Sequence, residues 1–375
     1  MTDPSIWREY GTPLLPPTAP GPLDGRTVAV KDLFAVGGFG IGAGNPVWLS
    51  AARPEPADAP AVARLREAGA AIAGIARTDE LAFSLSGANA HYGAPPNPAA
   101  PGLVTAGSSS GPASAVAMGQ ADIGLGTDTA GSVRVPASVC GLFGFRPTHG
   151  AVSLERVLPL ARSFDTSGWL TASARLLAEA GAVLLPPGPD AAPARLIPFD
   201  IPNGSSLLSR APALPLVSEA VLADSDLDGL LAAFRVAQAA EAWDSHGEWI
   251  TANPGALAAD VEARFRFGAD VSPDARTRAW EAIAGYRARV LDVLGDDTWL
   301  VLPAAGGPGH ARDATAGQKD AWRRATLRRT VIASAFGLPS VSVPTGASPP
   351  EGVALIGPPG SDHALLRAAA AVRDR

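Results

Sequence analysis

The chain has 375 residues, of which 47% are hydrophobic and 18% are charged, and its formal net charge is −6. This composition is typical of a globular protein with a large buried core, and the acidic balance argues against nucleic-acid binding. The sequence lacks an uninterrupted apolar run of about 18 residues and begins without a basic and apolar signal-peptide pattern, so we expect no membrane span and no secretion.

A single cysteine, Cys140, allows no internal disulfide and favours a reducing compartment, so we expect a cytoplasmic protein. Abundant Ala, Arg, Gly and Pro with only two lysines is typical of a GC-rich bacterial genome. The sequence has no His-Glu-x-x-His motif, no cysteine pair and no P-loop. We therefore expect neither a metal ion nor a cofactor.

The first predicted strand, Val28–Lys31, is apolar and rich in β-branched residues but ends in a lysine. A lysine in a buried position is costly unless it is neutral or well paired. Two interpretations follow: an ion pair with the neighbouring Asp32, or a catalytic base whose pKa is lowered by burial. The other lysine, Lys319, lies in a polar stretch and is expected to be a solvated helix charge.

Helices and strands alternate along the chain, which predicts an α/β fold with a mixed, mostly parallel sheet covered by helices on both faces. The expected elements in the first half are helix Ala59–Ala68, strand Ala71–Gly74, an element near Leu81, helix Ala113–Met118 and strand Ala121–Leu125. Those in the second half are helices over residues 218–245 and 275–294, strand Trp299–Pro303, helix Lys319–Phe336 and strand Val341–Pro344.

Two glycine-rich segments carry serines, one at Gly107-Ser-Ser-Ser-Gly111 and one between Gly124 and Ser132. Glycine adopts backbone conformations that other residues avoid and leaves space for a close approach, so serines flanked by glycine suit a catalytic site. With Lys31 upstream, these motifs resemble the amidase signature family, whose members hydrolyse amide bonds with a Ser–Ser–Lys triad. The likeness runs from about residue 23 to about residue 170 and returns in patches near the C-terminus. It implies a single amidase domain over residues 1–375, with residues 190–375 completing the sheet and the pocket.

The resemblance implies three catalytic roles. Ser132, in Gly126-Thr-Asp-Thr-Ala-Gly-Ser132, would be the nucleophile, and Lys31 would be the base. Ser108 would relay the proton between them, and in the family this serine follows a cis peptide bond.

The same resemblance implies supporting roles around the nucleophile. The backbone N–H groups of Thr129, Ala130 and Gly131, together with that of the nucleophile, would form an oxyanion hole. Asp128 and Arg134 would pair and brace the loop. One departure from the family pattern is Ala130, which stands where the family usually has glycine and fits only if its φ is negative.

Two alternatives compete with this interpretation. The segment Gly107-Ser-Ser109-Ser-Gly111 also fits the Gly-x-Ser-x-Gly elbow of α/β-hydrolases, which needs a histidine near Ser109. The second alternative is a catalytically silent binding protein with the amidase fold, like the chloroplast import-receptor relatives of the family. All three triad residues are present and no helical repeat extends the chain, which favours an enzyme.

Three segments resemble the indole-3-acetamide hydrolase group of the family: Gly44-Asn-Pro-x-Trp48, the run from Asn89 to Pro95, and the run from Gly144 to Ser153. The implied substrate is a primary amide of a small carboxylic acid, aromatic acids among the candidates, with release of ammonia. The same triad also suits secondary amides or esters. We expect a small-molecule amide as the only partner besides a second copy of the chain, since the sequence leaves a homodimer open.

Overall fold

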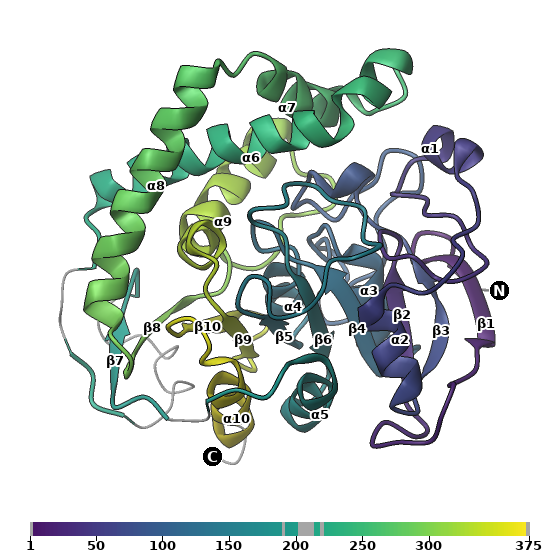
Figure 1. Cartoon of the computed structure of the whole chain (residues 1–375), viewed down its shortest axis with the longest axis horizontal. Coiled ribbons are helices and arrows are strands. Elements are labelled where there is room, and N and C mark those ends of the chain that lie inside the picture. Colours follow the sequence, from purple (N-terminus) through teal and green to yellow (C-terminus); the bar gives the residue numbers. More distant parts are fainter. Residues whose placement is uncertain (1–2, 190–191, 202–213, 218–220, 373–375) are drawn as a thin grey trace.

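The computed structural model describes residues 3–189, 192–201, 214–217 and 221–372. A ten-stranded sheet runs through the molecule in the order β1-β3-β2-β4-β6-β5-β9-β10-β8-β7 (Figure 1). The strands are β1 (Trp7–Leu15), β2 (Thr27–Lys31), β3 (Ala71–Ala76), β4 (Ile123–Thr127), β5 (Phe143–Arg146), β6 (Ser167–Thr171), β7 (Arg195–Pro198), β8 (Thr298–Pro303), β9 (Ser340–Pro344) and β10 (Gly352–Ile356).

The helices cover this sheet and extend beyond one edge of it. They are α1 (Pro46–Ala51), α2 (Pro60–Glu67), the 3₁₀ turn η1 (Glu80–Ala82), α3 (Ser110–Ala117), α4 (Arg134–Val139), α5 (Ala174–Leu184), α6 (Asp224–Ala252), α7 (Ala259–Ala269), α8 (Pro273–Leu294), α9 (Ala316–Phe336) and α10 (Asp362–Val372). The predicted α/β class with a mixed sheet and covering helices is confirmed. Residues 218–220, at the start of one predicted helix, lie outside the described residues.

The pairing of the strands differs from the expectation that parallel pairs predominate. The parallel pairs are β2–β3, β2–β4 and β7–β8, and the other six neighbouring pairs are antiparallel. The alternation of helices and strands correctly indicated the parallel pairs β3–β2–β4. The later strands return beside one another through loops and hairpins, and sequence periodicity does not report such pairings.

Side-chain size differs between the two faces of the sheet. Successive residues of a strand point to opposite faces, so Val28 and Val30 pack in the large core with α2, α5 and α10, and Ala29 packs with α3 and α4. Gly124 lies on the small-residue face, where a Cβ would come within 3.0 Å of the Pro112 carbonyl oxygen in α3. Small residues therefore let α3 and α4 approach the sheet closely, and these two helices follow the two serine clusters.

Helices α6 to α9 form a separate layer beside the β8 end of the sheet. Helix α6 packs along α7, α8 and α9, and these helices stand at the upper left of Figure 1. The core shared by α6, α8 and α9 includes Leu230, Phe234, Ile283 and Val331. This layer brings residues from the second half of the chain to the side of the sheet where β2 and β4 end.

Candidate active site

Lys31 ends β2 and is completely buried. Its Nζ donates to Ser108 Oγ at 2.8 Å and to Thr127 Oγ1 at 2.8 Å, at the carboxyl ends of the parallel strands β2 and β4. Burial lowers the pKa of Lys31 to about 7 despite three nearby carboxylates that act in the opposite direction. A lysine with such a pKa is substantially neutral near pH 7 and can accept a proton. The three carboxylates belong to Asp79, Asp128 and Asp165.

The alternative ion pair between Lys31 and Asp32 does not form. Asp32 instead lies against Arg8 of β1, whose Nε is 3.0 Å from Asp32 Oδ1. The same carboxylate oxygen accepts a hydrogen bond from the backbone N–H of Gly42 at 2.9 Å. Lys31 and Asp32 therefore have separate partners. Those of Lys31 are two hydroxyl groups and the carbonyl oxygen of Thr127 at 3.4 Å, with no paired carboxylate among them.

The two serine clusters lie against each other. The backbone N–H of Ser109 donates to the carbonyl oxygen of Ser132 at 3.2 Å. The peptide bond between Gly107 and Ser108 is cis. Ser108 is fully buried, whereas Ser132 keeps 4% of its surface exposed. The packing of α3 and α4 on one face of the sheet thus gathers Lys31, Ser108 and Ser132 in one region, with only the last of them reaching a cavity.

Asp128 connects the loop around Ser132 to two buried arginines. Arg134 Nε and Nη2 donate to the two carboxylate oxygens of Asp128 at 3.0 and 2.9 Å, and Arg146 Nη1 lies 3.0 Å from Asp128 Oδ1. Burial opposes ionisation of Asp128, but Arg134 and Arg146 outweigh it and hold the pKa of this carboxyl below its usual range. The predicted contact between Asp128 and Arg134 is present, and Arg146 extends it into a three-residue cluster.

We expect Asp128→Asn to destabilise the protein by about 3–5 kcal/mol, because it leaves two buried guanidinium groups without a counter-charge. Equilibrium unfolding in denaturant measures the change. Asp244→Asn is the matched control, because Asp244 pairs with Arg276 at the surface and such pairs contribute about 0–1 kcal/mol. Equal losses in the two variants would contradict the structural role of the buried cluster.

The N–H of Gly131 differs from the other backbone N–H groups that were expected to form an oxyanion hole. The Gly131 N–H donates to Asp128 Oδ1 at 2.9 Å, so the structure corrects the prediction that it is available. The N–H groups of Thr129, Ala130 and Ser132 make no hydrogen bond to a described residue. The backbone N–H groups of these three residues are therefore available as hydrogen-bond donors.

Ala130 lacks the positive φ that would require glycine at this position. It is not among the described non-glycine residues with positive φ, and its carbonyl oxygen accepts a hydrogen bond from Thr330 Oγ1 of α9 at 2.7 Å. Gly131 has a φ of 115°, and a Cβ there would lie 2.8 Å from Thr330 Cγ2. Alanine is therefore tolerated at position 130, whereas position 131 requires glycine.

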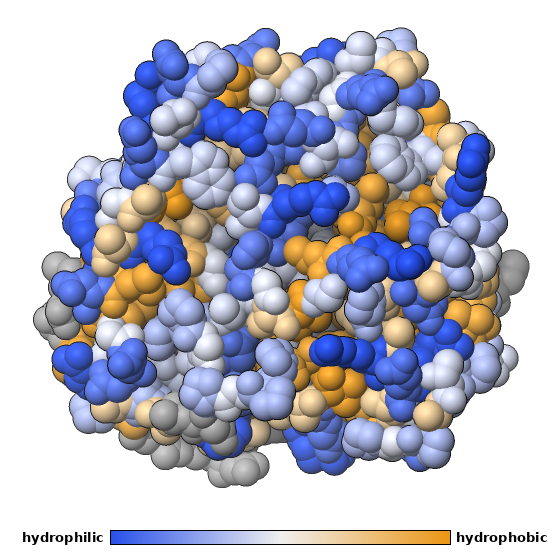
Figure 2. Space-filling view, in the orientation of Figure 1, coloured by the Kyte–Doolittle hydropathy of each residue, from blue (hydrophilic) through white to orange (hydrophobic). Residues whose placement is uncertain are grey.

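Ser132 lines a cavity, which we call the Ser132 cavity. Its wall combines the loop of Thr129 and Ala130, apolar side chains such as Phe83 and Leu327, and polar side chains that include Gln238 of α6 and Arg323 of α9. Figure 2 shows hydrophobic residues gathered around a hollow near the middle of one face, with hydrophilic residues over much of the remaining surface.

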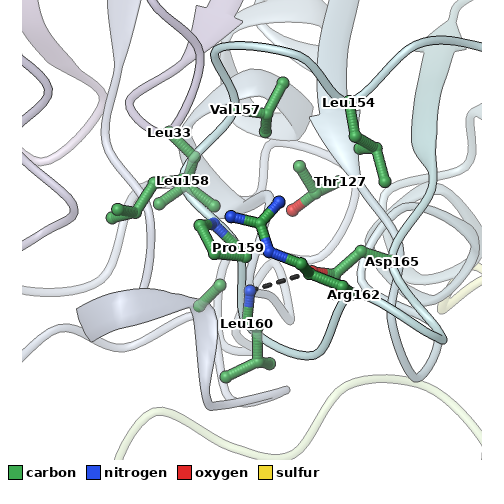
Figure 3. A pocket seen from close by; sticks show the side chains of 10 residues that line it. Leu33, Thr127, Leu154, Val157, Leu158, Pro159, Leu160, Arg162 and Asp165 are labelled. Atoms are coloured by element: carbon green, nitrogen blue, oxygen red, sulfur yellow. Dashed lines mark hydrogen bonds between the residues drawn. The ribbon is translucent and has the colours of Figure 1, made fainter. Parts of the chain in front are cut away.

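A second cavity shares Ala82 and Leu160 with the first. Figure 3 shows its mainly apolar wall and the guanidinium group of Arg162 extending across it. Thr127, the hydroxyl partner of Lys31, also contributes to this wall, so the second cavity approaches the buried lysine. The remaining wall residues include Leu33, Leu154, Val157, Leu158, Pro159 and Asp165.

Three residues of the site escaped the sequence analysis: Thr127, Arg146 and Asp165. Asp165 accepts a hydrogen bond from Thr129 Oγ1 at 2.6 Å, and burial raises its pKa to about 6. Arg146 and Asp165 both lie in segments that carried the family likeness, which was the available signal. Their contacts depend on β4 lying beside β6 and β6 beside β5, and sequence spacing does not report that order.

The α/β-hydrolase alternative lacks its histidine. Ser109 Oγ donates to the Thr127 carbonyl oxygen at 3.4 Å, and no described histidine contacts this hydroxyl. Cys140 is buried, and burial raises the pKa of its thiol, so it is unsuited to nucleophilic attack. Among the described residues, no group of three His, Cys, Asp or Glu side chains could hold a metal ion.

Comparisons with known proteins agree with this geometry. A family model described as Amidase matches residues 14–187. Amidase 1 of Oryza sativa subsp. japonica is 34% identical over 94% of this chain and 90% of its own length. Translocon at the outer membrane of chloroplasts 64 of Pisum sativum is 33% identical over 94% of this chain and 66% of its own length. A solved crystal structure of an amidase superposes with a TM-score of 0.79 at 28% identity, covering 94% of this chain and 85% of that one.

These relatives correct two expectations. The predicted cytoplasmic location is contradicted, because a relative that aligns with most of this chain is named for the chloroplast outer membrane. The predicted bacterial origin is not supported either, because both of these relatives are plant proteins. No helix in the described part of the chain combines the length and the apolar character needed to cross a membrane.

Proposed function

Because the chain belongs to the amidase signature family of hydrolases that act on C–N bonds, we propose that it converts a primary amide of a small carboxylic acid to the acid and ammonia. The observation that carries the proposal is the contact of 2.8 Å between Lys31 Nζ and Ser108 Oγ, beside a loop that presents Ser132 to a cavity. A buried lysine whose pKa is lowered to about 7 suits a base, and Ser132 suits a nucleophile.

In the proposed reaction, Ser132 Oγ attacks the amide carbon and passes its proton through Ser108 to Lys31. The C–N bond then breaks, and the proton returns to the nitrogen, which leaves as ammonia. Water attacks the resulting ester on Ser132 by the same proton route, which releases the acid and restores the serine. Lys31 is neutral at the start, charged during acylation and neutral again after ammonia has left.

Negative charge develops on the carbonyl oxygen in this reaction, and fixed N–H donors stabilise it. The open N–H groups of Thr129, Ala130 and Ser132 support the proposal that they form this oxyanion hole. Asp128 and Arg134 would act as positioning residues that fix the loop. Removal of one such donor in other hydrolases costs about 10²–10³ in kcat, so a displaced loop would lose most of the rate.

The proposal includes one catalytic domain over residues 1–375. A continuous sheet made from strands of both halves of the chain supports it, and the Ser132 cavity takes its walls from both halves. The homodimer stays a prediction.

We expect kcat/KM to rise with pH through about pH 7 and to level off above it, because protonated Lys31 cannot accept the serine proton. Below that pH the rate should fall about tenfold for each unit. Ammonia release measured from about pH 5 to about pH 9 tests this. The melting temperature over the same range serves as the control for unfolding. A rate that is independent of pH across pH 7 would contradict a lysine base.

Ammonia release from a panel of primary amides tests the function itself. The panel pairs aromatic amides, such as indole-3-acetamide, phenylacetamide and benzamide, with short aliphatic ones. Release from at least one amide without added metal, and unchanged by a chelator, is the expected result. Absence of hydrolysis across primary amides, secondary amides and esters would contradict the proposal and favour a binding role.

A further inference from the structure

The wall of the Ser132 cavity contains a partly buried cation that the proposed reaction does not use. Arg323 extends from α9 into this wall, and its Nε is buried without a hydrogen-bond partner. No hydrogen bond or ion pair joins its guanidinium group to any residue in the described ranges. Burial lowers the pKa of Arg323 only to about 10, so the group stays charged at neutral pH. The cavity therefore holds a positive charge without a counter-charge.

This isolation distinguishes Arg323 from the two arginines that are fully buried near the site, Arg134 and Arg146. Arg134 and Arg146 both lie within 3.0 Å of a carboxylate oxygen of Asp128. The acidic groups near Arg323 are Asp260 and Asp320, and neither forms an ion pair with it. Desolvation of an unpaired charge is costly, and the cost is offset when a ligand supplies the opposite charge.

Neighbouring groups also favour an anion. Arg235 and Arg264 lie close enough to lower the pKa of Arg323 further. Arg264 is fixed beside the cavity, because its Nη1 donates to the carbonyl oxygen of Phe83 at 2.8 Å and its Nη2 pairs with Asp260. Its charge is therefore balanced by Asp260, whereas no described residue forms such an ion pair with Arg323. Gln238, which is 5% exposed, faces the same cavity, and its side-chain amide has no hydrogen-bond partner among the described residues. A guanidinium fork beside an amide is a donor set that matches a carboxylate.

We propose that the substrate of this enzyme carries a carboxylate that binds Arg323 while its amide group faces Ser132, so that the substrate class is the monoamides of small dicarboxylic acids. This inference rests on the proposed amide hydrolysis. The amide C–N bond breaks and one water molecule is consumed. The products are ammonia and a dicarboxylate, whose original carboxylate stays on Arg323 until release.

The test compares amides that differ only in the presence of the carboxylate. Malonamate, succinamate and glutaramate are paired with propionamide, butyramide and valeramide, which carry a methyl group in its place. The wild-type protein is expected to prefer one acid over its neutral partner by about 10- to 100-fold in kcat/KM, as for a charge-assisted hydrogen bond to a carboxylate. The three chain lengths also measure how far the carboxylate site lies from the attacked carbon.

Arg323→Met is expected to reduce that preference to within a few-fold of unity, chiefly through a higher KM for the acid, and Arg323→Lys is expected to retain part of it. Arg324→Met is the matched control, because Arg324 neighbours Arg323 on α9 but is exposed, and it should keep the full preference. The comparison within the wild-type protein needs no variant, so it remains informative if Arg323→Met fails to fold.

The outcomes separate this inference from the function on which it rests. Faster hydrolysis of the neutral amide at every chain length would overturn the carboxylate site and leave amide hydrolysis intact. Equal losses for the acid and the neutral amide in Arg323→Met would overturn it too, because they indicate a structural role. Hydrolysis of none of the six amides, nor of the aromatic panel, would overturn the proposed function and this inference together.

Discussion

Ser132→Ala is expected to abolish ammonia release, with a loss of about 10⁴–10⁶ in kcat, while the protein stays folded. The substitution removes only the Oγ atom that would form the acyl-enzyme. The backbone contact between the Ser109 N–H and the carbonyl oxygen of residue 132 does not need the hydroxyl group. Turnover of the best amide of the panel and the melting temperature together measure the two parts of the prediction.

Ser109→Ala is the informative control for this variant. Ser109 is the nucleophile in the α/β-hydrolase alternative, and its hydroxyl donates to the Thr127 carbonyl oxygen at 3.4 Å. We expect this variant to lose far less activity than Ser132→Ala. If Ser109→Ala were inactive and Ser132→Ala retained wild-type turnover, the assignment of the nucleophile would be wrong.

Lys31→Met is expected to lower kcat/KM by about 10³-fold or more, because Lys31 is the one basic side chain in the described part of the chain that contacts Ser108 Oγ. Lys31→Arg should lose nearly as much, since arginine keeps a positive charge but does not release its proton in the pH range of activity. Methionine has a similar length without the charge, so removing a buried cation should leave the melting temperature equal or higher. Steady-state ammonia release and thermal unfolding measure both effects.

The chain supplies a matched control for the lysine variants. Lys319 is the only other lysine, lies near the start of α9 and makes no contact with the catalytic groups. Lys319→Met should keep the wild-type rate and pH profile. Wild-type activity in Lys31→Met or Lys31→Arg would contradict the role of Lys31 as the base, whatever the Lys319 variant does.

The catalytic candidates could be predicted because their signals are local. The glycine-flanked serines and the lysine at the end of an apolar strand each lie within a few residues of chain, and the structure brings Lys31 and Ser108 into contact. Thr127 was not predicted as a partner of Lys31. The strand expected over Ala121–Leu125 begins two residues later, at Ile123, and so ends at Thr127 beside Lys31. The hydrophobic run alone did not indicate that shift.

The environment of these residues could not be predicted, because it depends on contacts between distant segments. The hydrogen bond from the Gly131 N–H to Asp128 follows from the way that Arg134 and Arg146 hold this carboxylate. Arg146 reaches it only because β5 lies beside β6, which pairs with β4.

Helix α7 was also missed, and its sequence explains why. Its buried residues are only Val261, Phe265 and Gly268, a narrow stripe with weak helical periodicity. Arg323 falls within a helix that was predicted, over Lys319–Phe336, but its place in the wall of the Ser132 cavity depends on how α9 packs, which the sequence does not report.

The most direct test of the central claim is mass spectrometry of an acyl-enzyme. The protein is mixed with the amide of the panel that it hydrolyses fastest, quenched in acid during turnover, digested and mapped. We predict an acyl group on the peptide that contains Ser132, and no adduct in Ser132→Ala or in Lys31→Met at the same time point. An acyl group on Ser109, or an adduct on Ser132 that forms at the wild-type rate without Lys31, would contradict the Ser132–Ser108–Lys31 mechanism.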